Sequence, residues 1–250
     1  MGSFSTEAIV LRRKDVGEAD RFVVAFTRAV GKVLLIAKGV RRPISRMSGH
    51  LELGRSCRIQ IVERRSWSLI TQAETIKTYM SADADLQEVR DTLALLEVVD
   101  HIIDVNQRDS RVYDLLVAAL EAYQGADSAR RNLIAGSFTL RALALVGYQA
   151  ELGTCIKCNK EIEDVQDAVF NASRGGLVHK GCGLVGPGSF GLSLAATKLL
   201  KRMAVTDFGL LAGEVHSAEL ISEVDRPVRA FVEWTSEKQL KTAKLLVLPT

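Results

Sequence analysis

Three of the four cysteines in this chain lie within one stretch, GTCIKCNKEIEDVQDAVFNASRGGLVHKGCGL, residues 153–184. Cys155 and Cys158 are spaced C-x-x-C, and His179 and Cys182 form a second pair with the same spacing. Three thiolates and one imidazole are a ligand set of structural zinc sites, which are closed and tetrahedral. The stretch therefore predicts a structural Zn²⁺ site, in which metal binding would stabilise a segment too small to have its own core.

Other interpretations of these cysteines stay open. If His179 is only a surface residue beside Lys180, three thiols remain and no closed site forms. A redox-active dithiol is a further alternative, although a thioredoxin-type C-x-x-C follows a strand and opens a helix. Here the pair follows the end of a predicted helix and precedes the charged segment NKEIED. Cys57 lies far from the cluster, and we expect it to be a small buried apolar residue.

Basic residues gather near the N-terminus, although the net charge is only +3. Residues 1–80 carry 15 Lys and Arg against 7 Asp and Glu, whereas residues 81–150 carry 6 against 11. Such asymmetry predicts two modules with different partners, the basic one suited to a polyanion. The candidate DNA-binding residues are the basic residues at strand ends and in KGVRRPISR, with one aromatic residue: Arg12, Lys14, Lys38, Arg41, Arg42, Arg46, Arg64, Arg65 and Trp67.

These residue types match the chemistry of a single strand of DNA. Lys and Arg neutralise phosphates and release counterions, and an aromatic ring can stack on bases. KGVRRPISR contains no acidic residue, and Pro43 stiffens it. A tryptophan within a strand is nevertheless more often a core residue than a stacking platform, so Trp67 has both interpretations.

The elements that must position these residues differ along the chain. Residues 7–15, 20–28, 31–40, 57–64 and 67–77 are short β-rich runs with glycine-marked turns. They predict a small antiparallel sheet or a five-stranded barrel of the OB type. The one long connection, residues 41–54, is where such a barrel often carries a short helix.

Helical periodicity begins near residue 84. It places Val89, Leu93, Leu96 and Ile103 on one stripe, and the run 110–123 has a cleaner apolar face. A third helix is expected from Ser128, as its N-cap, to Gly147. Further helices follow over 193–205 and 217–236, with Pro227 kinking or splitting the last.

The overall prediction is an α+β fold with four parts. It comprises a nucleic-acid-binding OB-fold barrel (1–80), the first part of a helical domain (81–152), a zinc-ribbon-like hairpin insertion (153–186), and the second part of the helical domain with a polar C-terminal tail (187–250). The hairpin would run through VQDAVFNASRGGLV and bring the second ligand pair beside the first.

Several function classes lack support in the sequence. We find no P-loop, no H-E-x-x-H, no G-x-S-x-G and no catalytic constellation, so we expect a protein that is not an enzyme. No run approaches 18 uncharged apolar residues, and no signal peptide pattern opens the chain. With four cysteines and no secretion signal, a reducing cytoplasm is the expected location.

The string GEADRFVVAFTRAVGKVLLIAKGVRRPISR, with LVGYQAELGTCIKC and GGLVHKGC, resembles the bacterial recombination mediator family RecO in the right order along nearly the whole chain. The resemblance implies an OB-fold domain, a helical domain with a zinc module, and no enzymatic turnover. Many members close the module with C-x-x-C, where this chain has His179. Some members have no metal.

The resemblance also implies partners. RecO-like proteins bind single- and double-stranded DNA, anneal complementary strands in DNA repair and recombination, and act with RecR. Together they load RecA onto strands coated by single-stranded DNA-binding protein, whose acidic C-terminal tail they contact. In this chain ATKLLKRMAV, with Lys198, Lys201 and Arg202, is the best candidate for that contact. The family implies a bacterial cytoplasmic, nucleoid-associated protein. The alternative is a zinc-stabilised protein–protein adaptor without direct DNA binding.

Overall fold

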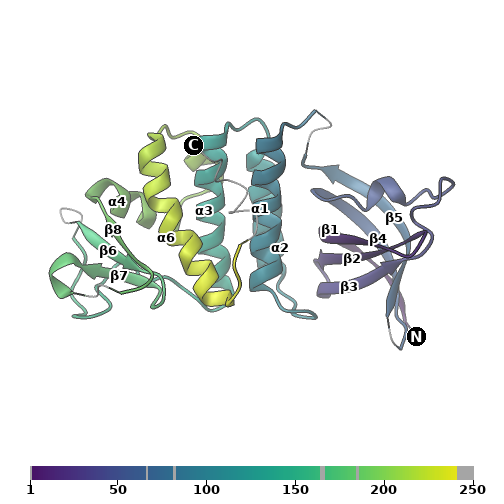
Figure 1. The fold of residues 1–250 in the computed structure, drawn as a ribbon, viewed down its shortest axis with the longest axis horizontal. Coiled ribbons are helices and arrows are strands. Elements are labelled where there is room, and N and C mark those ends of the chain that lie inside the picture. The colour runs from purple at the N-terminus through teal and green to yellow at the C-terminus, as the bar shows by residue number, and fades with distance from the viewer. Residues whose placement is uncertain (1, 66, 81–82, 164–166, 184–185, 241–250) are drawn as a thin grey trace. The chain divides into compact units, whose positions relative to one another are not determined.

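The computed structural model shown in Figure 1 describes residues 2–65, 67–80, 83–163, 167–183 and 186–240. The chain divides into two compact units, Met1–Val117 and Ala118–Thr250, whose boundary falls within helix α2 (Ser110–Tyr123). The predicted boundaries at residues 80, 152 and 186 stay predictions. The start of the predicted hairpin, at residues 165–166, and the predicted tail over 241–250 lie outside the described residues.

Five strands form the sheet of the first unit: β1 (Ser3–Val16), β2 (Asp20–Thr27), β3 (Gly31–Ala37), β4 (Arg55–Val62) and β5 (Ser68–Thr78). They close into a barrel in the order β1-β2-β3-β5-β4, with β1 paired to β4. The five predicted strands are confirmed to within a few residues. One feature differs, because β3 and β5 run parallel while the other pairs are antiparallel.

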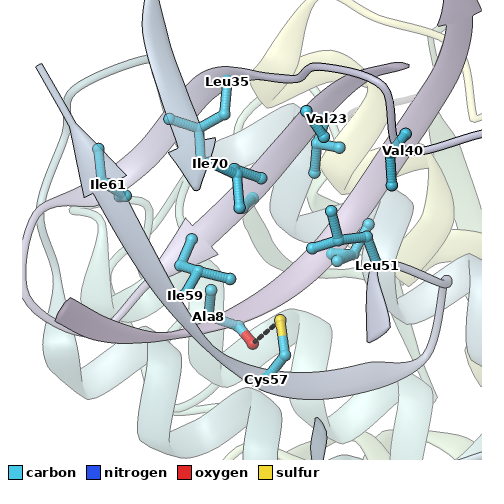
Figure 2. Close-up of a cluster of buried hydrophobic side chains, with 12 residues drawn as sticks. Ala8, Val23, Leu35, Val40, Leu51, Cys57, Ile59, Ile61 and Ile70 are labelled. Atoms are coloured by element: carbon cyan, nitrogen blue, oxygen red, sulfur yellow. Dashed lines mark hydrogen bonds between the residues drawn. The ribbon is translucent and has the colours of Figure 1, made fainter. Parts of the chain in front are cut away.

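The barrel core follows from side-chain alternation along each strand. Inward positions such as Val23, Leu35 and Ile59 are almost fully buried, and their side chains converge in Figure 2. Cys57 is fully buried among them, and its Sγ lies 3.6 Å from the carbonyl oxygen of Ala8. The prediction that Cys57 is a small buried apolar residue is therefore confirmed.

The long connection between β3 and β4 contains the short helix that the sequence predicts, a 3₁₀ turn at η1 (Ser48–His50). The connection is fastened at both ends, because Val40 and Leu51 are fully buried in the barrel core (Figure 2). Between them the chain leaves the core and exposes residues 41–44.

Helix α1 (Leu86–Ile102) begins at Asp85, whose side chain accepts a hydrogen bond from the backbone of Glu88. Within the first unit α1 contacts β1. The predicted stripe is partly wrong, because Val89 and Leu93 are only half-buried. The buried positions of α1 and its C-cap are Asp91, Thr92, Leu95, Leu96, Val98, Val99, Asp100 and Ile103.

The second unit contains α3 (Ser128–Leu145), α4 (Leu194–Met203), α5 (Phe208–Ala212) and α6 (Ala218–Ser236). The N-cap of α3 is Asp127, which accepts from the backbone of Arg130, and not Ser128 as predicted. Helix α6 is continuous through Pro227, so of the two expected effects splitting is wrong and kinking stays a prediction. No helix in the described part of the chain is both long and apolar enough to cross a membrane.

A three-stranded sheet in the order β7-β6-β8 completes this unit: β6 (Ala168–Asn171), β7 (Gly176–His179) and β8 (Ser189–Leu192). It lies beside α4 and α6 in Figure 1, and Phe170 meets Phe231 of α6 at a ring-centroid distance of 5.8 Å. An added Cβ at Gly175, whose φ is +65°, would lie 2.8 Å from the Phe231 ring. Strand β8 and helix α5 are not anticipated by the sequence analysis.

Candidate nucleic-acid interface and metal centre

The four predicted ligands come from two turns. Cys155 and Cys158 belong to a tight turn in which the backbone N–H of Asn159 donates to the carbonyl of Cys155 over 2.8 Å. Asn159 has a φ of +58°, a left-handed conformation that asparagine tolerates better than most residues. His179 ends β7, and Cys182 closes the 3₁₀ turn η2 (Lys180–Cys182) that follows.

Backbone pairing brings the two turns together. The N–H of Ile156 donates to the carbonyl of Leu177 in β7 over 3.0 Å, so the first turn is fastened to the strand that leads to His179. Lys157 Nζ donates to the carbonyl of Cys182. The ligand atoms of Cys155, Cys158, His179 and Cys182 consequently all lie within 4.8 Å of one another.

His179 has the orientation that a metal ligand needs. Its Nε2 lies 3.0 Å from the carbonyl oxygen of Glu161, and because a carbonyl only accepts, Nε2 carries the proton. Its Nδ1 then presents a lone pair to the sulfur atoms of Cys158 and Cys182, at 3.4 and 4.0 Å. Such a backbone acceptor behind a histidine ligand fixes the tautomer and the ring.

The electrostatics of the cluster also favour a cation. Burial opposes ionisation of Cys155, but hydrogen bonds from the backbone of Cys158, His179 and Lys157 outweigh it and lower the pKa of the thiol to about 6. A proton on His179 Nδ1 would be shared with the Cys158 sulfur, which raises the pKa of His179, and a bound cation would take the place of that proton. Burial and the neighbouring sulfur atoms raise the pKa of Cys182. Thiolates this close repel one another, and a divalent cation would remove that repulsion.

The basic connection, residues 38–46, leaves the barrel beside the β1–β2 turn. The N–H of Gly39 donates to Asp20 Oδ1 over 2.7 Å, and the N–H of Arg41 donates to the carbonyl of Ala19 over 2.9 Å. Four cations of this connection are exposed: Lys38, Arg41, Arg42 and Arg46. The structure therefore presents them on one anchored loop, next to the turn that follows Lys14.

Not all of these cations are unpaired. Arg41 Nε lies 3.2 Å from Asp15 Oδ2, so an acidic residue of β1 partly neutralises the loop. Arg12 is held similarly, with its Nε 2.7 Å from Asp100 Oδ2 of α1. KGVRRPISR itself contains no acidic residue, but Arg41 has an acidic partner that lies 26 positions earlier in the chain.

Trp67 is 48% exposed and precedes β5, so the interpretation of it as a core residue is wrong. Its ring lies against Phe22 of β2, with the centroids 5.4 Å apart. Phe22 is paired across the barrel wall with Lys14 on β1 and Ile36 on β3. Directly paired residues point to the same side of a sheet, so Lys14, Phe22 and Ile36 form an outer-face row beside Trp67.

Arg64 and Arg65 are exposed on the β4–β5 connection, two to three positions before Trp67. Phe22 is the residue of this face that the sequence analysis missed. Its position in DRFVVAFT, next to inward-facing Val23, is the signal that would have placed it outside the barrel.

The candidate peptide contact on α4 is less open than its sequence suggests. Lys201 Nζ donates to the carbonyl of Ile162 over 2.7 Å, which supports the segment that follows the C-x-x-C turn. Arg202 pairs with Glu214. Lys198 is exposed and has no ion pair within the part of the chain that the structure describes.

Comparison with known proteins covers both units. Residues 1–79 match the family model Recombination protein O N terminal, and residues 92–244 match Recombination protein O C terminal. DNA repair protein RecO of Bifidobacterium adolescentis is 32% identical over 248 residues, which cover 98% of this chain and 100% of that protein. DNA repair protein RecO of Thermobifida fusca is 32% identical and that of Symbiobacterium thermophilum 29%, each aligned over 98% of this chain. The chain belongs to the RecO family.

Proposed function

We propose that this protein is a DNA-binding recombination mediator that anneals complementary strands in recombinational DNA repair, and that it is not an enzyme. The names of its relatives, DNA repair protein RecO, support the repair role. The closed five-stranded order with a helix in the β3–β4 connection supports an OB-type barrel as the DNA-binding part.

The observation that carries the proposal is one anchored loop with four exposed cations on the same barrel as an outer-face aromatic pair, in which Trp67 is exposed and Phe22 is half-buried. The loop provides Lys38, Arg41, Arg42 and Arg46, and the pair is Phe22 with Trp67. Basic grooves with aromatic platforms bind single strands without sequence preference, since every base has a flat face.

Annealing sets two physical demands on such a surface. It must screen the repulsion between two phosphate backbones, and it must leave the base edges free to pair. Cations on an exposed loop meet the first demand by contacting phosphates, which carry no sequence information. Trp67 meets the second if it stacks on a base face, because stacking leaves the Watson–Crick edge accessible.

We propose a structural role for the metal. Cys155, Cys158, His179 and Cys182 would hold Zn²⁺ in a closed, ribbon-like site that joins the C-x-x-C turn to the β6–β7 hairpin. A four-ligand site leaves no open position for a substrate, so its contribution is the folding of residues 153–182.

The partner interactions are proposals from the family. We propose that the protein acts with RecR to load RecA onto strands coated by single-stranded DNA-binding protein. Lys198, with Lys201 and Arg202 nearby, is the candidate contact for the acidic tail of that coating protein. The contacts of Lys201 and Arg202 within the chain leave Lys198 as the first residue to replace.

The test replaces Lys38, Arg41, Arg42 and Arg46 together by Ala and measures single-strand affinity from 50 to 300 mM salt. The slope of log K against log salt is negative, and each lost phosphate contact should make it shallower by about 0.7. The loss of all four contacts should therefore reduce the magnitude of the slope by up to about 3. A charge-matched control replaces four exposed cations of the second unit, Lys160, Arg174, Arg226 and Lys238.

An unchanged affinity and slope in the loop variant would remove this loop from the interface. If the parent itself shows no salt-dependent binding to single or double strands, the adaptor without direct DNA binding is the better description. A strand-annealing assay on coated strands, with and without RecR, then tests the mediator role.

A further inference from the structure

The tip of the basic loop carries apolar surface that phosphate binding does not explain. Ile44 is 89% exposed, and Pro43 next to it is exposed as well. Single exposed apolar side chains are common on proteins. This pair is different in its setting, because Arg42 precedes it and Arg46 follows it on a segment otherwise made of polar residues.

The tip is a defined turn. The N–H of Ser45 donates to the carbonyl of Arg42 over 2.8 Å, so Pro43 and Ile44 are the two central residues of a β-turn. Proline fixes the φ of the first central position, which lowers the entropy lost when the turn is held against a ligand. A second turn precedes it, because the N–H of Arg42 donates to the carbonyl of Gly39 over 3.1 Å.

The turn is also held in place by the barrel. Val40 and Leu51, on either side of the exposed segment, are fully buried in the core shown in Figure 2. The Arg42 side chain lies over Gly39, where an added Cβ would be 3.7 Å from its Cδ and Nε. Ile44 is therefore held in a defined position relative to the barrel, with cations on both sides.

We propose that Pro43 and Ile44 form an apolar wedge that packs against the faces of unstacked bases in a single DNA strand, while Arg42 and Arg46 hold the phosphates on each side. The inference rests on the proposed DNA binding. Apolar side chains such as Ile and Pro enter base steps and separate them in known architectural proteins. Here the wedge would break stacking within one strand and so present its base edges to a complementary strand.

The size and charge of a single DNA strand fit the wedge and its cations better than those of a protein or a lipid surface. A stable protein interface buries about 800 Å² on each partner, far more surface than the two side chains offer. A lipid surface needs a broader apolar face than one isoleucine. A base step is of the right scale, and the phosphates that accompany it complement the four cations of the loop.

The experiment compares the parent with Ile44→Ala, using Ile76→Ala as the control. Ile76 is the same residue type on the same barrel and is 48% exposed on β5, outside the loop. The probe is a single strand with 2-aminopurine at its centre, whose fluorescence rises when the base is unstacked. Affinity is measured on the same strand from 50 to 300 mM salt.

We expect Ile44→Ala to bind about threefold to tenfold more weakly at every salt concentration and to lose most of the fluorescence rise. The salt slope should stay as in the parent, because no cation is removed. Ile44→Met should retain the rise, and Ile76→Ala should match the parent in both measurements.

Three outcomes overturn the wedge. Ile44→Ala could keep the parent's affinity and fluorescence rise, or Ile76→Ala could lose as much as Ile44→Ala. A lower salt slope in Ile44→Ala would show that the residue acts only by positioning the arginines. If the parent binds no DNA, the proposed function fails first and the inference with it, so the two failures are distinguishable.

Discussion

At the scale of single residues, Asp15 partly neutralises one of the four loop cations, Arg41. Its carboxylate accepts from Arg21 Nε over 2.8 Å and pairs with Arg41 over 3.2 Å. The hydrogen bond from Arg21 holds the pKa of Asp15 below its ordinary value. A lowered carboxylate pKa means that the pairs are intact above the unfolded value of 3.8 and are lost only as the pH falls below it. A change of pH between 5 and 9 therefore does not release Arg41 from Asp15.

Asp15→Asn should therefore strengthen single-strand binding. It frees Arg41 for a phosphate and removes one negative charge, so we expect a severalfold gain at 50 mM salt and a salt slope about 0.7 steeper. Glu18→Gln is the matched control, since Glu18 is exposed in the neighbouring β1–β2 turn and has no ion pair in the described chain. An equal gain in Glu18→Gln would mean that the overall charge, and not the release of Arg41, is responsible.

His179 is the second residue whose replacement gives a clear test, here of the proposed metal site. His179→Ala removes one of the four proposed ligands and should lower zinc affinity by at least tenfold, as measured by competition with a chelator and by native mass spectrometry. His179→Cys should retain the metal. His216→Ala is the control, because His216 contacts Glu214 and lies outside the cluster. Single-strand affinity should be unchanged in all three, and zinc held by His179→Ala as tightly as by the parent would exclude this histidine.

At the scale of elements, the sequence predicts what depends on local pattern. The sequence predicts the five barrel strands with small errors at their ends, since alternation identifies them. It does the same for four of the five helices of at least ten residues, which a 3.6-residue period identifies. Strand β8 was missed because SFGL is short and lies in a glycine-rich segment. The fifth helix, α1, was predicted with a partly wrong face, because it has apolar residues on more than one side and the buried face includes Asp100, which pairs with Lys32.

The candidate metal site could be predicted from the sequence for the same reason, since each of its two ligand pairs has a short, local C-x-x-C-like spacing. The ligand atoms of the cluster meet within 4.8 Å as the hairpin prediction requires. The candidate DNA-binding surface was harder to predict from the sequence. Whether Arg12 and Arg41 are paired, and whether Trp67 faces solvent, depends on residues far away in the chain.

Removing the metal should loosen one element and leave the others folded. We expect chelation to speed hydrogen exchange over the C-x-x-C turn and η2, because the few hydrogen bonds that join these turns would then lose the support of the ligand cluster. Strands β1–β5 should keep their protection, since their core contains none of the ligands. Exchange measured by mass spectrometry on the parent with and without chelator tests this. Equal loosening of the barrel would show that the metal supports more than the module.

At the scale of the whole molecule, part of the charge asymmetry along the sequence is neutralised by ion pairs within the first unit. Acidic residues of α1 and α2 neutralise cations of the barrel within the first unit: Asp100 pairs with Arg12 and Lys32, and Asp114 pairs with Arg28. The acidic middle of the chain therefore does not by itself indicate a separate partner. In the described chain these acidic residues make no ion pair with the loop over residues 38–46, where Arg41 pairs with Asp15 instead.

This pairing predicts how α1 and the barrel depend on each other. Lys32 is only 5% exposed, and its Nζ lies 3.1 Å from Asp100 Oδ1 and 2.6 Å from the Asp100 carbonyl. Asp100→Asn removes the carboxylate beside that buried ammonium, so it should lower the free energy of unfolding by about 3 to 5 kcal/mol, as for a broken buried pair. Asp114→Asn is the control, because the Arg28–Asp114 pair is exposed and such pairs contribute about 0 to 1 kcal/mol.

Urea denaturation followed by tryptophan fluorescence can measure this difference in stability between Asp100→Asn and Asp114→Asn. The fluorescence must then come from the barrel alone. Trp234→Phe provides that background, since it leaves Trp67 as the only tryptophan of the chain. In this background we expect the Trp67 transition of Asp100→Asn to move to lower urea, while Asp114→Asn stays near the parent. Equal shifts in the two variants would mean that the buried pair adds no more than an exposed one. α1 would then contribute to the first unit through apolar packing alone.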